Sequence, residues 1–313
     1  MLLLTGTHKH SCCDNDIYCV NGLHRKPSFI LFDEENRRID KIIPFSKNLD
    51  SDITNQGRDP FRPFGITSDN NFIYIASNDK ICSFDKKTFE YKKLISSTGN
   101  VNTHHLLHYN GYIYRCDTSV NCITRIDLKT SEEIYYDCLS KQRLSILPKT
   151  FHAKEKDSEH INSLMIHNNK LYVIANCLGK KPSYCFTLDL ELNNYEKYMS
   201  NLGFQVHDII NFKNKYYALD SRGGNLTVFD TKKNKEVYKI IDNKYWFLRG
   251  MIQKKNNIYI FGTIRRPHGI EVKDYSKLII FNVETNTFDD VKLYDISVIL
   301  QVQNYNKFGE MNE

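Results

Sequence analysis

A short phrase of strand-forming residues recurs along the chain and constrains its fold more than any other feature. An aromatic-rich run follows an Asn, Gly or Lys turn in five places: NNFIYIAS, NGYIYRCD, NKLYVIAN, NKYYALDS and NNIYIFGT. A second apolar run ends in Asp or Asn six times, at Asp33, Asp85, Asp127, Asp189, Asp230 and Asn282. Alternating β-branched and aromatic residues suit a pleated sheet, and Asn and Asp suit the turns between strands. The sequence therefore predicts a repeated antiparallel unit.

The spacing of this unit predicts a β-propeller, because four-stranded blades repeat roughly every 40 to 60 residues. We expect an all-β, six-bladed β-propeller with four-stranded blades, formed by a single domain over residues 1–313. The N-terminal copy lacks an inner strand, which we expect Asp295 to Gln303 to supply. The N- and C-terminal strands would then close one blade and remove an open sheet edge. The expected blades span about 1–45 with 295–303, 61–95, 103–137, 160–198, 206–241 and 248–293.

Composition narrows the classes of function. The net charge of +6 is modest for 313 residues and comes from scattered lysines, so nucleic acid is not an expected partner. No apolar run approaches the length of a membrane span, and the apolar start MLLL is too short for a signal peptide. Nine cysteines without framework spacing indicate free thiols. We therefore expect a cytoplasmic protein with no membrane contact.

Polar residues gather where the inner strands are expected to begin. Each of the five aromatic-rich runs contains a tyrosine at the matching position: Tyr74, Tyr114, Tyr172, Tyr217 and Tyr259. Counting back from these tyrosines gives one column of Phe64, His104, Asn162, His207 and Arg249, with Gly65, His105, Ser163, Asp208 and Gly250 next to them. His160 lies two residues before Asn162 and shares its strand face. Inner strands line the channel of a propeller. We therefore expect these histidines, the amide and the guanidinium to converge on one axial site, with the Asp208 side chain alternating away from it.

Three long loops are expected to open on the same face, over His8 to Lys26, Asp137 to Glu159 and Arg265 to Lys277. Long loops on a rigid scaffold often carry function. The first holds His8, His10, Cys12 and Cys13, which could bind zinc, although their spacing matches no familiar zinc module and favours an ordinary loop. The candidate catalytic residues are His207, His160 and His104. The candidate substrate-binding residues are Asn162, Arg249, His105, Arg62, Arg265, Arg266 and His268.

Two resemblances follow from these motifs. The segments that carry the first resemblance are FRPFGI, NTHHLL, HINSLMI, VHDII, LDSRGGNLTVFD and LRGM. Through them, most of the chain resembles the uncharacterised TIGR03032/DUF4915 propeller family, which implies a fold and no particular activity. In the same order, THHLL, HINSL and QVHDI resemble the inner-strand motifs of the six-bladed bacterial arylsulfate sulfotransferases.

The second resemblance implies transfer of a sulfuryl group through a sulfated histidine. His104 would be a binding histidine, His160 and Asn162 would hold the sulfuryl oxygens, and His207 would be the nucleophile. The arginine of that family would fall at Asn176-Cys177-Leu178 here. Arg249 would have to supply the charge from another blade.

Three functions are open at this point. The first is an enzyme acting on a small anionic molecule or sugar derivative, by sulfuryl or related group transfer or by lyase chemistry, because imidazoles serve as nucleophiles and as acid–base groups near neutral pH. The second is a metal enzyme with His104, His160 and His207 as ligands. The third is a non-catalytic propeller that binds a ligand or a protein.

Overall fold

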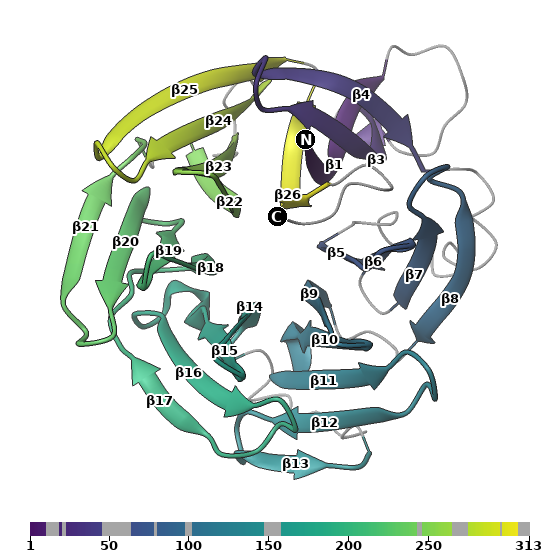
Figure 1. Ribbon diagram of the computed structural model, residues 1–313, viewed down its shortest axis with the longest axis vertical. Coiled ribbons are helices and arrows are strands. Elements are labelled where there is room, and N and C mark those ends of the chain that lie inside the picture. Colours follow the sequence, from purple (N-terminus) through teal and green to yellow (C-terminus); the bar gives the residue numbers. More distant parts are fainter. Residues whose placement is uncertain are drawn as a thin grey trace.

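The computed structural model describes residues 1–10, 19–20, 23–45, 64–77, 80–97, 102–146, 158–242, 246–264, 275–294 and 296–305. The chain forms six antiparallel sheets arranged as the blades of a β-propeller around a central axis (Figure 1). The predicted fold is therefore confirmed. None of the helices among these residues is long and apolar enough to cross a membrane.

Blades B to F each place their first strand next to the axis and their last strand at the rim, whereas blade A has the C-terminal strand next to the axis (Figure 1). Blade B contains β5 (Gly65–Ser68), β6 (Phe72–Ser77), β7 (Lys80–Asp85) and β8 (Tyr91–Ser97). Blade C contains β9 (Thr103–Tyr109), β10 (Tyr112–Asp117), β11 (Cys122–Asp127), β12 (Glu133–Asp137) and a fifth strand, β13 (Gln142–Leu144). Blade D contains β14 (Ile161–His167), β15 (Lys170–Ala175), β16 (Tyr184–Asp189) and β17 (Glu196–Met199).

The remaining blades follow the same order. Blade E contains β18 (Val206–Phe212), β19 (Lys215–Asp220), β20 (Asn225–Asp230) and β21 (Lys235–Lys239), and blade F contains β22 (Trp246–Lys254), β23 (Asn257–Ile264), β24 (Tyr275–Asn282) and β25 (Thr287–Tyr294). Blade A joins both ends of the chain, through β1 (Leu2–His10), β2 (Cys19–Val20), β3 (Leu23–Asp33), β4 (Arg38–Pro44) and β26 (Ile296–Asn304).

The predicted closure of blade A is present. Strand β26 pairs antiparallel with β1, with Leu4 opposite Val302, and forms the inner strand of the blade (Figure 1). The side-chain oxygen of Gln301 also accepts a hydrogen bond from the backbone N–H of Ile66 at 2.8 Å. The C-terminal strand therefore connects blade A to blade B as well as to the N-terminus.

Two of the three expected long loops contain more structure than predicted. Strands β1, β2 and β3 occupy much of His8 to Lys26, and β13 lies within Asp137 to Glu159. Short apolar stretches flanked by polar residues gave no clear strand signal there. Of the third segment, residues 265–274 lie outside the described residues.

The turns confirm the reading of the repeat. At the end of the third strand of blade C, Oδ1 of Asp127 accepts backbone hydrogen bonds from Lys129 at 2.7 Å and Thr130 at 3.0 Å, and Asp85 does the same in blade B. Asn168 and Asn169 both adopt positive φ in the turn between β14 and β15, as a two-residue hairpin turn requires. The recurring Asp and Asn residues therefore close the turns.

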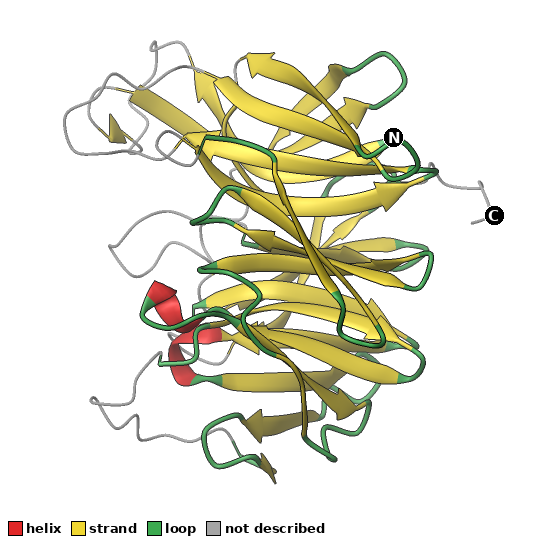
Figure 2. Ribbon diagram, turned by 90° about the vertical axis from the view of Figure 1, so that its left-hand side faces the viewer, coloured by secondary structure: helices red, strands yellow, loops and turns green. Residues whose placement is uncertain are grey.

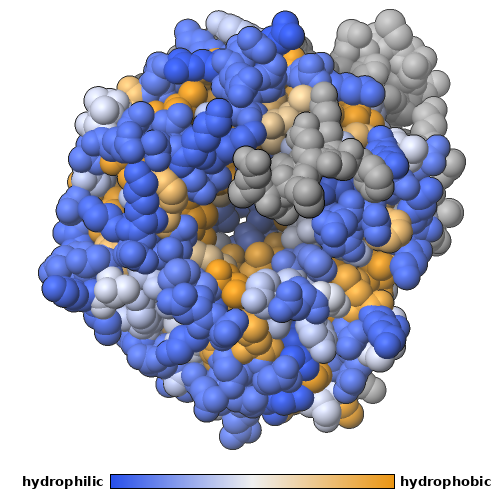
Figure 3. Space-filling model, in the orientation of Figure 1, coloured by the Kyte–Doolittle hydropathy of each residue, from blue (hydrophilic) through white to orange (hydrophobic). Residues whose placement is uncertain are grey.

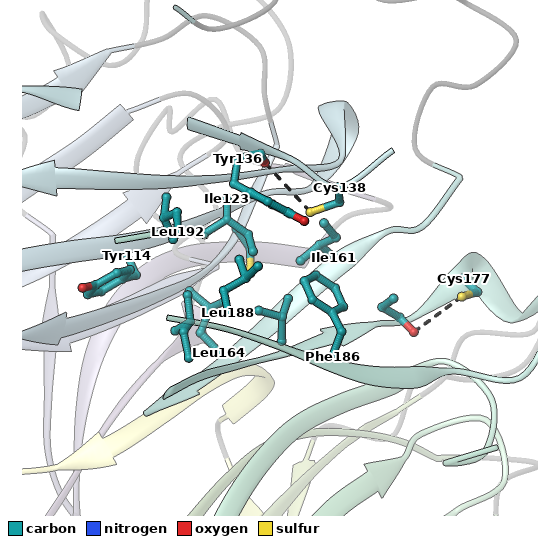
Figure 4. Close-up of a cluster of buried hydrophobic side chains, with 14 residues drawn as sticks. Tyr114, Ile123, Tyr136, Cys138, Ile161, Leu164, Cys177, Phe186, Leu188 and Leu192 are labelled. Carbon is teal, nitrogen blue, oxygen red and sulfur yellow. Dashed lines mark hydrogen bonds between the residues drawn. The ribbon is translucent and has the colours of Figure 1, made fainter. Parts of the chain in front are cut away.

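The core lies between blades. Middle strands such as β15 are buried on both faces, whereas the rim strand β21 is mostly exposed. Between blades C and D, for example, Tyr114, Ile123, Leu164 and Phe186 pack in one apolar cluster (Figure 4). Burial of each such side chain contributes about 1.5–3 kcal/mol. Because every blade packs on its neighbours in this way, the inner strands are held firmly around the axis.

Two short 3-10 helices follow second strands, η2 (Thr118–Val120) after β10 and η3 (Cys177–Gly179) after β15. Second strands run antiparallel to inner strands, so both helices lie on the face where the inner strands begin. Figure 2 shows them on the same side of the disc. This face holds the candidate site.

Candidate functional site

Four inner strands carry a β-bulge close to their first residues. In each, one residue has no partner on the second strand: His104 in β9, Asn162 in β14, Asp208 in β18 and Gly250 in β22. Asp208 and Gly250 have positive φ values of 57° and 71°. A bulge interrupts the alternation of side chains and often lies beside an active site. It therefore changes which residues face the axis.

The bulges also correct the predicted column. By strand pairing, His207 and Arg249 lie level with His105 and Ser163, whereas His104 and Asn162 are the bulged residues. The bulge follows His207 and Arg249 but coincides with His104 and Asn162. Counting residues alone cannot detect this shift by one position.

The structure nevertheless brings together His104, His160, His207 and Arg249. The His104 ring stacks on Phe64, with ring centroids 5.0 Å apart, and meets the edge of His160 at 4.9 Å. In blades E and F, the rings of His207 and Phe247 lie 5.1 Å apart, and Cζ of Arg249 lies 5.4 Å from the Phe247 ring centroid.

Electrostatic effects link the His104–His160 pair and the His207–Arg249 pair into one cluster. Burial, then His160, then Arg249 hold the pKa of His104 well below its usual value of 6.5. Burial first, then Arg249, His104 and His160 do the same to the pKa of His207. We call His104, His105, His160, Asn162, His207, Asp208 and Arg249 the axial site. The space-filling view shows the centre of the ring as hollowed (Figure 3).

The hydrogen bonds of His207 define its tautomer. Its Nδ1 lies 2.8 Å from the carbonyl oxygen of Gln205 and 2.9 Å from Oγ of Ser221, which itself donates to the carbonyl oxygen of Leu248 at 2.7 Å. A carbonyl oxygen only accepts, so Nδ1 carries the proton. The lowered pKa keeps the ring neutral near pH 7. Nε2 therefore holds an unprotonated lone pair, and it is buried with no hydrogen-bond partner among the described residues.

Other buried polar atoms of the axial site share this property. Buried polar groups in proteins are nearly always hydrogen-bonded. Within the described part of the chain, the following buried atoms lack a protein partner: Nδ1 of His104, Nδ1 of His105, and both Oδ1 and Nδ2 of Asn162. Three imidazoles and one amide with unmet hydrogen bonds indicate a site for a polar molecule.

The side chain of Asp208 lies inside the site, contrary to the prediction that it points away. Its Oδ2 accepts a hydrogen bond from the backbone N–H of Met251 at 2.8 Å, and Oγ of Ser163 donates to its Oδ1 at 3.4 Å. The same Oδ1 lies 3.6 Å from Nε2 of His105. Burial raises the pKa of Asp208 to about 6. The bulge at Asp208 reverses the side-chain alternation on which the prediction depended.

Comparison with known proteins shows the fold alone. No protein-family model matches the chain, and no curated protein matches it in sequence. Several solved structures share its fold. A chain of a nidogen/laminin complex is 10% identical with a TM-score of 0.59, over 96% of this chain and 97% of that one.

Two bacterial propellers are also similar in structure. A catalytically inactive virginiamycin B lyase from Staphylococcus aureus, solved with quinupristin, is 13% identical with a TM-score of 0.54, over 91% of this chain and 84% of that one. A member of the DUF4221 family from Bacteroides vulgatus is 11% identical with a TM-score of 0.50, over 78% of this chain and 84% of that one. These neighbours support a propeller family, whereas the two more specific resemblances are unconfirmed.

Several other predicted site residues either lie outside the described residues or have a structural role. Arg62, Arg265, Arg266 and His268 lie outside the described residues, as do Cys12 and Cys13. Asn176, where the sulfotransferase arginine was expected, bonds the backbone through its side chain, donating to the Val206 carbonyl oxygen at 3.1 Å. That position therefore has a structural role.

The metal interpretation receives no geometric support. In the part of the chain that the structure describes, no three His, Cys, Asp or Glu side chains are arranged to hold a metal ion. His104, His160 and His207 interact through rings and charge, but they do not form a set of converging ligands. Sequence reasoning had missed Gln205 and Ser221, because residues that bond a histidine through a carbonyl or hydroxyl leave no motif.

Proposed function

We propose that the axial site is the active site of an enzyme in which His207 acts as a general base or nucleophile on a small anionic or sugar-like substrate. The observation that carries this proposal is the state of His207. Gln205 and Ser221 engage Nδ1, while Nε2 presents a buried lone pair with no protein partner among the described residues. A neutral imidazole held in one tautomer can take a proton or attack an electrophilic centre.

Other residues of the site suit supporting roles. Arg249 lies close enough to affect the pKa of both His104 and His207, so its guanidinium can stabilise negative charge that develops on the substrate. The amide of Asn162 offers one donor and one acceptor. Asp208, with a pKa of about 6, is mostly ionised near pH 7, and its protonated fraction of roughly a tenth can donate a proton to the leaving group.

Two reaction classes fit these residues. In a lyase reaction, His207 removes a proton from a carbon beside a carboxylate, and the electron pair expels a leaving group that Asp208 protonates. In sulfuryl transfer, Nε2 attacks sulfur, the S–O bond of the ester breaks, and the leaving oxygen takes a proton from Asp208 to give an alcohol or phenol. The resemblance of THHLL, HINSL and QVHDI suggests this reaction. The similar fold of a lyase at 13% identity supports enzymatic chemistry on this scaffold without fixing the reaction.

One experiment tests both classes. The protein is incubated in D₂O with a panel of uronates, and NMR follows exchange of the carbon-bound hydrogen beside the carboxylate. In parallel it is incubated with 4-nitrophenyl sulfate, and mass spectrometry searches for a sulfuryl group on the peptide that contains His207. We expect one of these signals in the wild type and its loss in His207→Ala.

The matched control is His167→Ala, because His167 lies at the opposite end of β14 from His160 and packs against Tyr172 and Tyr216. This variant should retain the signal. Absence of both signals in the wild type, or their survival in His207→Ala, would contradict the proposal. The non-catalytic binding scaffold would then be the better description of this fold.

A further inference from the structure

The hydrogen-bonding capacity of the axial site restricts the ligand that it can bind. His207 contributes an acceptor at Nε2, because its proton is held on Nδ1 by the Gln205 carbonyl oxygen. Inorganic sulfate and phosphate present mainly oxygen acceptors. An acceptor facing an acceptor leaves both groups unsatisfied, which is costly in a buried site. A ligand hydroxyl, in contrast, donates to Nε2.

Asn162 also favours a ligand that carries hydroxyl groups. The residue is 3% exposed, and neither Oδ1 nor Nδ2 has a hydrogen-bond partner in the described residues. A carboxamide needs one group that donates and one that accepts, whichever way the amide is oriented. A hydroxyl group can do both. Together, His207 and Asn162 therefore match a ligand with more than one hydroxyl group.

The charges of the site limit the charge of the ligand. Arg249 is a permanent cation that influences His104, His207 and Asp208. Asp208 lies in the same site, 3.6 Å from His105, and ionises with a pKa of about 6. Near pH 7 its negative charge opposes a second negative charge on the ligand. One anionic group, placed at Arg249, is therefore the largest negative charge that these groups accommodate.

We propose that the ligand of the axial site is a hydroxylated monoanion, whose anionic group pairs with Arg249 and whose hydroxyl groups bond Nε2 of His207 and the amide of Asn162. Sugar acids and sugar monosulfates share this chemistry. The inference rests on the proposed function only in taking the axial site as the ligand site. Binding can be measured whether or not turnover occurs.

A comparison of four probes separates the need for hydroxyl groups from the need for one anionic group. Isothermal titration calorimetry with D-glucuronate and D-glucose 6-sulfate tests ligands that have both features. D-glucose has hydroxyl groups alone, and inorganic sulfate has negative charge alone. Each charge-assisted hydrogen bond contributes enough free energy for roughly a tenfold gain in affinity. We expect at least one of the first two probes to bind about tenfold or more tightly than glucose or sulfate.

Two measurements locate the binding. In Arg249→Gln, the preferred anionic sugar should bind no more tightly than glucose, whereas His167→Gln should leave its affinity unchanged. In the unaltered protein, ¹⁵N NMR should show Nε2 of His207 gaining a hydrogen bond with that probe and Nδ1 remaining protonated. This second measurement does not depend on the folding of any variant.

The result has clear alternatives. If inorganic sulfate binds as tightly as both anionic sugars, or if glucose does, or if none of the probes binds, the inferred ligand class is wrong. A response of glucuronate alone identifies a carboxylate ligand, and a response of glucose 6-sulfate alone identifies a sulfate ester. If an anionic sugar binds at His207 but neither proton exchange nor sulfuryl transfer occurs, the ligand class stands and the catalytic proposal fails.

Discussion

The imidazole of His105 on β9 lies 3.6 Å from the carboxylate of Asp208 on β18, although β14 lies between these two strands in the ring. The contact crosses from blade C to blade E. It is possible because Asp208 occupies a bulge with a φ of 57°. This pair places two buried titratable groups in the axial site, and both influence how the stability of the protein responds to pH.

Replacement of Asp208 by Asn should change the pH dependence of stability. Burial raises the pKa of Asp208 from 3.8 to about 6, so between these values the folded state keeps a proton that the unfolded state releases. The wild type therefore becomes less stable relative to Asp208→Asn as pH rises from about 4 to about 6. The total is about 3 kcal/mol. Urea unfolding across this range measures the difference.

Asp127→Asn is the control for this measurement. Backbone hydrogen bonds from Thr130 and Lys129 lower the pKa of Asp127 below 3.8, so it stays ionised across the same range. Because the unfolded carboxyl begins to bind protons near pH 4, the difference of Asp127→Asn from the wild type should change only slightly across this range, and in the opposite direction to that of Asp208→Asn. A similarly slight change for Asp208→Asn would show that the carboxylate is not desolvated.

His105→Gln should make the protein less sensitive to acid. Burial lowers the pKa of His105 from 6.5 to about 3, so the unfolded state binds a proton that the folded state excludes. The contribution of His105 to the free energy of unfolding then falls by about 1.4 kcal/mol per pH unit as pH decreases below 6.5, in addition to the opposite effect of Asp208. Urea unfolding at several acidic pH values should give a shallower slope for His105→Gln. Equal slopes would contradict the burial of this ring.

His207→Ala should fold but lose some stability. The sequence led us to expect a channel-mouth side chain with little burial, whereas the structure shows His207 only 7% exposed and bonded to Gln205 and Ser221. Removal of these bonds should cost about 1–3 kcal/mol, while the six-bladed fold remains. Circular dichroism and urea unfolding test this. A loss above about 5 kcal/mol would identify a core histidine.

The sequence predicted the fold well because two local signals repeat. Alternating residues specify each strand, and Asp127 and its equivalents specify each outer turn through bonds to the next backbone N–H groups. Both signals act within a few residues. The predicted closure by the C-terminal strand followed from counting strands, since the first blade lacked one.

The candidate site was predicted less completely, because each bulge shifts the register of its inner strand by one residue and so changes which side chains face the axis. His104, His160, His207 and Arg249 were expected together and lie within electrostatic reach of one another. Asp208 was expected to face away from the axis, because strict alternation of side chains along a strand does not allow for the extra residue of a bulge. Gly250 in LRGM offered a hint, because glycine suits the positive φ of a bulge. The orientation of Asn162 depends on the same irregularity.

The six described cysteines should react slowly in the native protein. Cys82, Cys116, Cys122, Cys138, Cys177 and Cys185 are all buried, and none of them forms a disulfide within the described part of the chain. Burial raises the pKa of Cys177 to about 12 and that of Cys116 well above 9.0, so little reactive thiolate forms near pH 7.

Ellman's reagent should therefore modify at most three of the nine cysteines rapidly. Alkylation of unfolded, non-reduced protein should find all nine free, because the spacing of the cysteines predicts reduced thiols. A native disulfide, or rapid reaction of more than three thiols, would contradict this prediction.

Removal of strand β26 should prevent folding. This strand pairs with β1 along blade A and buries Ile296, Ile299 and Val302 in the core shared with blade F. The loss of three such side chains alone costs about 5–9 kcal/mol, similar to the whole stability of a typical domain. It also exposes the edge of β1, which can pair with another chain. A chain ending at residue 294 should therefore be insoluble or unfolded, whereas one ending at residue 305 should remain soluble and unfold cooperatively, as judged by size-exclusion chromatography and thermal melting. Cooperative unfolding of the shorter chain would show that the first blade is stable without its C-terminal strand.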